Sequence, residues 1–312
     1  MIITKEIDIE NINKYDNLIK SYNKLKIRNT NNKNIELIYE FVPHLKSLVI
    51  FDITFNKEFY LIESLEELIF SGTCEFNKKI IPNKNLKILE FGYWFNQPII
   101  LNENLIELKF GYYFNHSIIL NNNLKILKFG ARFNQLIELN YELNILKFGD
   151  WFNQPIELND KLIELKFGHY FNHPIILNNE LVELRFGFKF NQPIELNKNL
   201  IELHFGDCFN QSIILNQNLI KLYFGNSFNQ HIILNNNLKY LKFGNEFNKP
   251  VELNENLIEL QFDYCYNQPI ELNEQLEIFK IYKYNNKLNK FINSLKYLKK
   301  DLVDDYIIYY LK

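Results

Sequence analysis

The amino-acid sequence predicts a mainly β protein: a β-solenoid of about twelve coils with a 19-residue period. Two observations predict this fold. A Phe-Asn pair recurs every 19 residues from Phe76-Asn77 to Phe247-Asn248, and Tyr266-Asn267 continues the series. Each repeat is also too short for a strand, a full helix and two loops, because helical repeats need about 33 residues or more.

One repeat, residues 86–104, reads LKILEFGYWFNQPIILNEN, and the consensus is LxxLxFGxxFNQPIxLNxx. We number its positions 1 to 19 from the first Leu. The apolar positions 1, 4, 6, 10, 14 and 16 are expected to face the core. The LxxLxF and PIxLN segments are expected to be extended, and the second alternates with the period of a strand. A single coil cannot enclose a core, so stacked coils complete it.

Glycine and proline mark the corners of each coil. The protein has ten glycines, all of which we assign to position 7, and most of its eight prolines fall at position 13. Asp263 replaces the glycine in the last regular repeat. Since Asp is among the few residues that tolerate a positive φ, position 7 is predicted to be a turn with that backbone conformation.

Positions 11 and 17 hold asparagine in every regular coil, even where neighbouring positions vary. Stacked side-chain amides can bond one another and the backbone of the next coil, so both positions are predicted to form structural ladders at buried corners. The candidate ladder residues are Asn96, Asn115, Asn134, Asn153, Asn172 and Asn191 at position 11, and Asn102, Asn121, Asn140, Asn159, Asn178 and Asn197 at position 17.

Position 9 is the most distinctive of the variable positions. It reads Trp94, Tyr113, Arg132, Trp151, Tyr170 and Lys189, and then becomes small or polar from Cys208 onward. Trp, Tyr and Arg are enriched in interface hot spots. The first six residues are therefore candidates for partner binding. The alternative is that these side chains only cover the Phe core at a corner.

The two ends depart from the repeat. We expect an N-terminal cap of mixed structure over 1–44, a repeat solenoid over 45–281 with regular coils over 65–275, and a helical cap over 282–312. The helix is predicted from apolar residues at i, i+3, i+4 and i+7 spacing. These residues are Leu288, Phe291, Ile292, Leu295, Leu298 and Leu302. Repeat proteins need such caps to block end-to-end stacking.

The motif LxxLxF-GxxFNQP-IxLN resembles the FNIP repeat over residues 65–275, and more loosely over 45–64. The resemblance implies a leucine-rich-repeat-like solenoid. Many FNIP proteins resemble substrate-recognition subunits in which an F-box ahead of the repeats docks a ubiquitin ligase. Residues 1–44 lack the Leu-Pro pair that opens an F-box, and their sole proline is Pro43. No adaptor-binding residues are therefore assigned.

The remaining features favour a non-catalytic protein. The net charge is -2 and the three cysteines form no pair at metal-ligand spacing, so we expect no metal, no cofactor and no nucleic-acid partner. No Ser/His/Asp or Cys/His set converges, and the polar N-terminus favours the cytoplasm. No membrane partner is expected. The predicted function is a protein-interaction scaffold that uses the strand face and position 9 to bind an unidentified protein. The alternative is a ubiquitin-ligase subunit with a degenerate or missing F-box, which would contact the ligase adaptor.

Overall fold

The computed structural model describes residues 4–8, 23–28, 37–285, 288 and 299–311. The chain forms two compact units, Met1–Lys161 and Leu162–Lys312. Both are built from the same 19-residue coil, and the chain contains about 13 coils. The short helix α1 spans Leu37–Phe41, and among the other described residues only Leu288 is helical. The protein is thus a mainly β, leucine-rich-repeat-like solenoid, as predicted.

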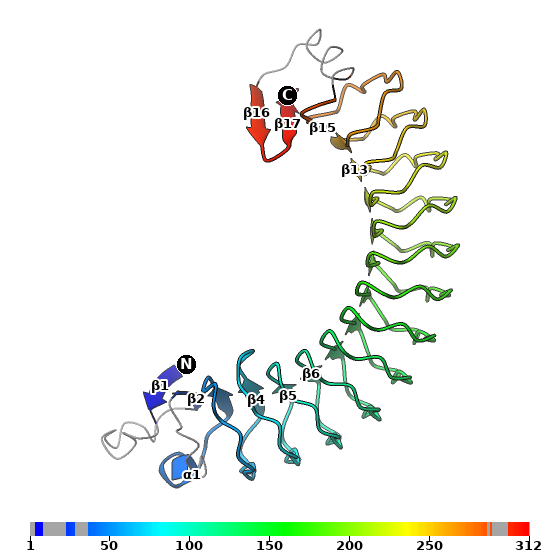
Figure 1. Ribbon diagram of the computed structural model, residues 1–312. Coiled ribbons are helices and arrows are strands. Elements are labelled where there is room, and N and C mark those ends of the chain that lie inside the picture. The colour runs from blue at the N-terminus through cyan, green and yellow to red at the C-terminus, as the bar shows by residue number, and fades with distance from the viewer. Residues whose placement is uncertain (1–3, 9–22, 29–36, 286–287, 289–298, 312) are drawn as a thin grey trace. The chain divides into compact units, whose positions relative to one another are not determined.

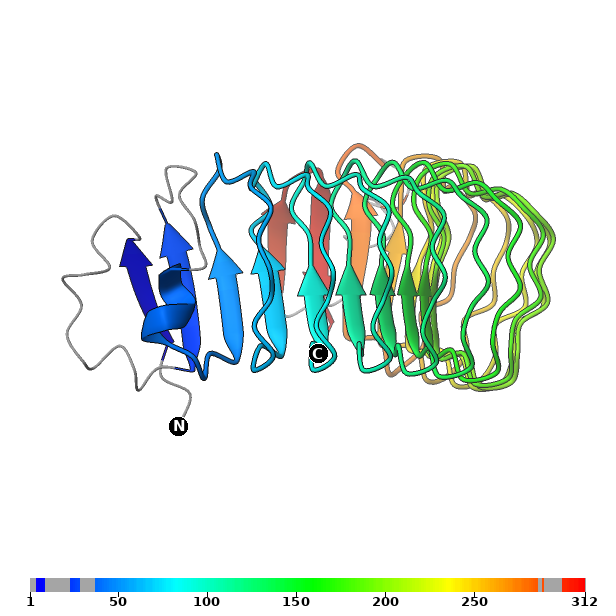
Figure 2. The same cartoon turned by 90° about the horizontal axis from the view of Figure 1, so that it is seen from below.

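The first unit is a stack of parallel strands (Figures 1 and 2). Every pairing within it is parallel and in register, so that Leu89 pairs with Leu108 and Leu108 with Leu127. The strands are β1 (Thr4–Asp8), β2 (Lys24–Arg28), β3 (Ser47–Ile50), β4 (Glu67–Phe70), β5 (Ile88–Glu90), β6 (Glu107–Lys109), β7 (Ile126–Lys128) and β8 (Ile145–Lys147).

The second unit continues the pattern and then changes it. Its parallel strands are β9 (Glu164–Lys166), β10 (Glu183–Arg185), β11 (Glu202–His204), β12 (Lys221–Tyr223), β13 (Tyr240–Lys242), β14 (Glu259–Phe262) and β15 (Ile278–Tyr282). An antiparallel hairpin of β16 (Lys299–Val303) and β17 (Tyr306–Tyr310) follows, and β17 pairs with β15. Asp304, with a φ of 53°, supplies the left-handed turn of this hairpin.

The repeat explains where each strand lies. Positions 3 to 5 form the strand, with the Leu of position 4 buried and its two neighbours half-buried. The PIxLN segment is extended, but among the described residues it makes no strand pairing, so each coil contributes one strand. Position 14 is buried, whereas most Leu residues at position 16, such as Leu101, are only half-buried. The prediction that position 16 faces the core was therefore only partly correct, because most of these Leu side chains are partly exposed.

Two columns of phenylalanine rings fill the core. Within one coil Phe91 and Phe95 stack with their centroids 3.6 Å apart. From coil to coil the position 6 rings are 5.6 Å apart, as in Phe91 and Phe110, and the position 10 rings about 6.2 Å, as in Phe95 and Phe114. The coils are thus more tightly spaced at position 6, the column nearer the sheet.

Position 7 is glycine for a different reason from the one predicted. Among the described residues only Asp304 has a positive φ outside glycine, and no glycine has one. A Cβ on Gly111 would lie 1.9 Å from the carbonyl oxygen of Gly92 in the preceding coil. Close approach of neighbouring coils therefore excludes a side chain. Gly72 is an exception, because a Cβ on it would meet nothing within 4 Å, and a Cβ on Gly92 would meet the carbonyl oxygen of Ser71.

Both predicted asparagine ladders form, by two different sets of bonds. At position 17 the Nδ2 group donates to backbone carbonyls of the preceding coil: Asn121 bonds Asn102 O at 2.5 Å and Leu105 O at 3.0 Å. At position 11 the Oδ1 atom accepts the backbone N–H of the next coil, as when Asn115 N donates to Asn96 Oδ1 at 3.0 Å. Position 11 is exposed or half-buried, so its predicted burial was wrong.

The helical cap predicted for 282–312 is not supported: residues 299–303 and 306–310 are strands, and in the described part of this segment only Leu288 is helical. Leu302 lies in β16 and is 67% exposed, and Tyr309 of β17 is fully buried. Leu288 is buried, while the other predicted helix positions, within 289–298, lie outside the described residues. At the N-terminus β1, β2 and α1 occupy the predicted mixed cap, of which residues 1–3, 9–22 and 29–36 lie outside the described residues.

Candidate functional site

The candidate partner-binding residues lie at the turn that follows each strand. In the first unit these turns stack through backbone hydrogen bonds: Tyr113 N donates to Tyr93 O at 3.1 Å, and Trp151 N donates to Ala131 O at 2.8 Å. Because each turn repeats the backbone of the one before it, side chains at equal positions project in the same direction. The repeat thereby turns a periodic sequence into a continuous surface.

Stacked aromatic rings form this surface in the first unit. Trp94 and Tyr113 at position 9 stack with centroids 4.9 Å apart and planes 15° apart. At position 8, Tyr93 and Tyr112 stack in a second column, 4.7 Å apart. We call the six side chains of these two columns the aromatic ridge: Tyr93, Trp94, Tyr112, Tyr113, Arg132 and Trp151.

Arg132 joins the rings of the ridge. Its guanidinium carbon lies 5.0 Å from the centroid of Tyr113 and 5.8 Å from that of Trp151. A guanidinium between aromatic faces is held by cation–π attraction. The charge of Arg132 is therefore fixed in the middle of the ridge instead of moving freely on a flexible side chain.

The ridge is half-exposed. Trp94 is 44% exposed and Trp151 51%, although the Phe residues beneath them are buried. Since ring faces are used in stacking between coils, the ring edges and the polar Tyr, Trp and Arg groups meet solvent. A partly exposed row of Trp, Tyr and Arg has the composition of an interface hot spot.

Two of the six predicted residues, Tyr170 and Lys189, belong to the second unit. There Tyr170 is 44% exposed and its ring contacts His169 edge-on, with centroids 4.5 Å apart. Lys189 Nζ lies 5.3 Å from the ring of Phe188, which stacks on His169 at 4.7 Å. Later position 9 residues of this unit, such as Cys208 and Ser227, build no such cluster.

The sequence prediction missed position 8. Tyr93 and Tyr112, with His169 and Phe188 in the second unit, are as much part of the aromatic surface as position 9. The signal was present, because position 8 is aromatic in four of the six coils in which position 9 is aromatic or basic. It was overlooked because position 8 is small or acidic in the two coils between them, at Ala131 and Asp150, and polar in most later coils.

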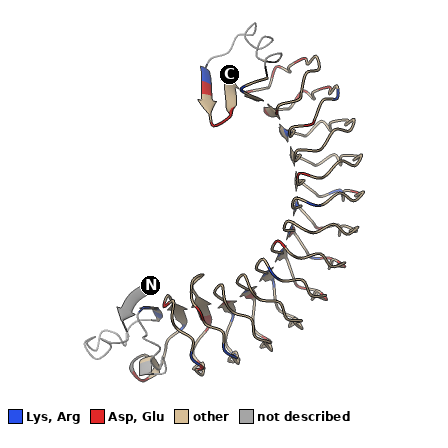
Figure 3. Ribbon diagram, viewed as in Figure 1, with Lys and Arg blue, Asp and Glu red and all other residues tan. Residues whose placement is uncertain are grey.

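The strand face carries charged residues in both units (Figure 3), and several of these charges are paired with one another. In the first unit Lys109 bonds Glu107 at 2.8 Å and lies 3.3 Å from Glu90. In the second unit Glu202 accepts from Arg185 at 2.7 Å and from Lys221 at 2.9 Å. Such pairs neutralise the face locally, which leaves it less suited to binding a strongly charged ligand.

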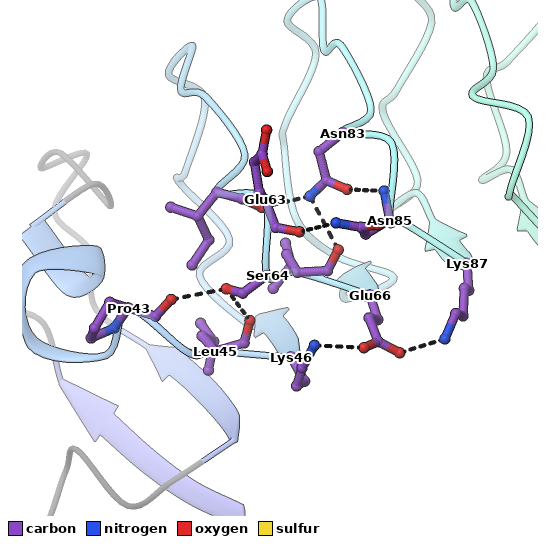
Figure 4. A network of polar contacts seen from close by, with 11 residues as sticks. Pro43, Leu45, Lys46, Glu63, Ser64, Glu66, Asn83, Asn85 and Lys87 are labelled. Carbon is purple, nitrogen blue, oxygen red and sulfur yellow. Dashed lines mark hydrogen bonds and ion pairs between the residues drawn. The ribbon is translucent and has the colours of Figure 1, made fainter.

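A similar network of ion pairs connects residues that lie just before the strands of the first unit. Glu66 lies between Lys46 and Lys87, each at 2.7 Å, and Ser64 and Asn85 bond backbone carbonyls nearby (Figure 4). Hydrogen bonds from both lysines lower the pKa of Glu66. This network links three successive coils and is structural in character.

The three cysteines are unpaired, and potential metal ligands are scattered over the described residues. Cys74, Cys208 and Cys265 are free thiols, and burial raises the pKa of Cys74 to about 11, which makes it a poor nucleophile. Among the described residues no three His, Cys, Asp or Glu side chains are grouped to hold a metal ion. Over the same residues no helix has the length and apolarity needed to cross a membrane.

No family model matches the sequence, and a search of curated proteins finds no match. Among solved structures, the chain is similar to CroV588, described as a novel circular LRR protein, with 27% sequence identity and a TM-score of 0.43. The similarity covers 83% of this chain and 56% of that one. The leucine-rich-repeat-like assignment rests on the coils themselves.

Proposed function

We propose that this protein is a non-catalytic scaffold that binds another protein through the aromatic ridge. The observation that carries the proposal is the row of half-exposed Trp, Tyr and Arg side chains on stacked turns of the first unit. Rigid aromatic side chains give a large contact area and lose little conformational entropy on binding. A repeat unit that fixes them in a row offers a preorganised surface.

The nature of the partner follows from the same surface. A nucleic-acid groove would need many unpaired basic residues, whereas strand-face lysines such as Lys109 and Lys221 are bonded to glutamates. A protein partner, in the cytoplasm, fits a surface with one fixed cation and several ring edges. We also propose that the coils belong to the FNIP type of repeat, on the strength of the LxxLxFGxxFNQPIxLN motif.

The experiment compares wild-type protein with a Trp94→Ala/Trp151→Ala variant by proximity labelling in the native cell. Loss of a central anchor should lower partner capture by about thirtyfold, equivalent to about 2 kcal/mol. The matched control is Ser227→Ala/Glu246→Ala at position 9 of the second unit. The proposal fails if the captured proteins are unchanged in the tryptophan variant while its thermal unfolding matches that of wild type.

A role as a ubiquitin-ligase subunit is the alternative proposal. It would require an adaptor-binding segment within residues 1–44, of which 9–22 and 29–36 lie outside the described residues. A pull-down of the purified ligase adaptor by the full chain tests it. Capture that disappears when residues 1–44 are removed would favour this role over a simple scaffold.

A further inference from the structure

A hollow of about 460 Å³ lies in the second unit where the regular coils meet the hairpin of β16 and β17. Its wall combines tyrosine rings, carboxylates and amides. Three of the tyrosines come from different elements: Tyr264 follows β14, Tyr282 ends β15 and Tyr306 begins β17. The hollow therefore exists only because the hairpin folds back onto the coils.

The tyrosines are arranged differently from the rings of the core. Tyr282 lies 5.7 Å from Tyr264 at an interplanar angle of 77°, and 6.0 Å from Tyr306 at 78°. The core Phe rings, in contrast, stack nearly parallel and cover one another's faces. Perpendicular rings around a hollow leave π faces turned in several directions, which is how aromatic cages present themselves to a cation.

Asp263 supplies the negative charge. It stands at the position that is glycine in the preceding coils, and only 7% of the residue is exposed. Its partners are neutral: Tyr306 donates its hydroxyl to Oδ2 at 2.7 Å, and with the Asn245 amide in the orientation that satisfies both of its groups, the amide nitrogen lies 2.8 Å from Oδ1. Burial and the bond to Asp263 raise the pKa of Tyr306, so the phenol remains a donor.

Within the described part of the chain, no Lys, Arg or His bonds the Asp263 carboxylate. The nearby Lys283 pairs with Asp305 at 2.6 Å. A buried carboxylate with neutral partners carries a desolvation cost that a cation in the hollow would offset. The charge of the site and the geometry of its rings thus point to the same kind of ligand.

We propose that this hollow binds a quaternary alkylammonium group. Both Asp263 oxygens already accept hydrogen bonds, so the site favours a cation that donates none and is held by charge and ring faces. A divalent metal ion would need about six or more oxygen ligands, which the ring walls do not provide. The group can come from a free small molecule such as choline or from a trimethyllysine side chain of a protein.

The experiment titrates choline into the full chain by isothermal calorimetry, with 3,3-dimethylbutan-1-ol as the uncharged isostere. Choline should bind saturably, and the uncharged isostere should bind at least about tenfold more weakly than choline. A short trimethyllysine peptide forms a second arm, and the tighter of the two ligands identifies the source. Equal binding of choline and its isostere, or saturable binding of calcium without choline, overturns the proposal.

Two variants separate ligand binding from a merely structural role of Asp263. Asp263→Asn keeps an acceptor for Tyr306 but removes the charge, and should weaken choline binding about tenfold or more. Tyr282→Leu should do the same, whereas Tyr282→Phe keeps the ring and should bind within about threefold of wild type. Tyr141→Leu in the first unit is the control and should change nothing. If Asp263→Asn does not fold, the Tyr282 pair decides, and equal affinity in Leu and Phe variants refutes the cage.

Discussion

At the scale of single residues, asparagine solves two problems in the same coil. At position 11 its carbonyl oxygen accepts a backbone N–H from the next coil, and at position 17 its amide nitrogen donates to carbonyls of the preceding one. Position 17 needs a short side chain that ends in an amide donor, which Asp lacks and which Gln would place one carbon too far away. Position 19 adds a third set, as when Asn104 Nδ2 donates to Lys84 O at 2.7 Å.

Substitution of a position 17 asparagine should be costly. Asn121→Ala leaves the carbonyls of Asn102 and Leu105 without their donor at a buried site, and should lower the free energy of unfolding by about 1–3 kcal/mol. Its neighbour Asn122 is exposed, so Asn122→Ala should cost less than about 0.5 kcal/mol. Urea denaturation measures both. Equal losses would show that the ladder does not stabilise the coil stack.

Glu202 and His204 make stability depend on pH. Burial opposes ionisation of Glu202, but bonds from His204 and Lys221 outweigh it and hold its pKa below the usual 4.5. Burial lowers the pKa of His204 below 6.5, against the pull of Glu202. In both cases the unfolded chain binds protons first, so stability falls as pH drops, from about 6.5 for His204 and from about 4.5 for Glu202.

The test measures the free energy of unfolding of wild type and Glu202→Gln from pH 7.5 to 3. The difference between them should be greatest above pH 4.5 and should shrink as the pH falls below that value, because the carboxylate of the wild type is then protonated. Glu271→Gln, an exposed change, is the control. A difference that stays constant down to pH 3 would show that Glu202 contributes no charge-dependent stability.

At the scale of the coil, contact between neighbouring backbones decides the sequence. Gly111→Ala would place a Cβ 1.9 Å from Gly92 O and force two coils apart, which should cost about 3 kcal/mol or more. Gly72→Ala meets open space without a positive φ, so stability should change by less than about 1 kcal/mol in either direction. Urea unfolding of the pair provides the comparison, and similar losses would contradict close approach as the cause.

The coil could be predicted from the sequence because every copy repeats the same constraints. The spacing of Leu89, Phe91 and Phe95 recurs in each coil. This pattern alone predicted the strand, the corner and the core positions of a coil. The reason for glycine could not be predicted, because the distance between Gly111 and Gly92 is set by the stack and not by either coil. Ser71, and not Gly72, directly follows Phe70 and lies beneath Gly92, so the assignment of Gly72 to position 7 was wrong.

The region after β15 shows where local pattern misleads. Apolar spacing up to Leu302 favoured a helix, yet residues 299–303 and 306–310 are strands. The exposed edge of β15 offers unpaired backbone groups, and pairing with the β-branched and aromatic residues of β17 satisfies them. The position 9 residues of the aromatic ridge were predicted, because Trp and Arg are rare in this sequence. Tyr93 and Tyr112 at position 8 were not, because their role depends on the stacking of one turn on the next.

At the scale of the whole molecule, each unit is stabilised by contacts between consecutive coils, so its stability depends on how its terminal strands are covered. In the second unit β17 covers β15 with antiparallel pairing, and β16 then presents Lys299, Lys300 and Asp301 outward. Charged residues on an outermost strand discourage pairing with other chains. The hairpin is therefore both a cap for the core and a barrier to assembly.

Removal of the hairpin should convert the protein into a self-associating form. A chain that ends at residue 298 loses Tyr309, which is fully buried, and uncovers Phe279 and the paired edge of β15. An open parallel edge above an apolar core is a template for another strand, so light scattering should show oligomers together with a lower melting temperature. Leu302→Lys, an exposed change on β16 that leaves β17 in place, should remain as wild type. A truncated chain that stays monomeric and melts at the temperature of wild type would contradict this prediction. It would mean that the hairpin is not needed to cover the edge of β15.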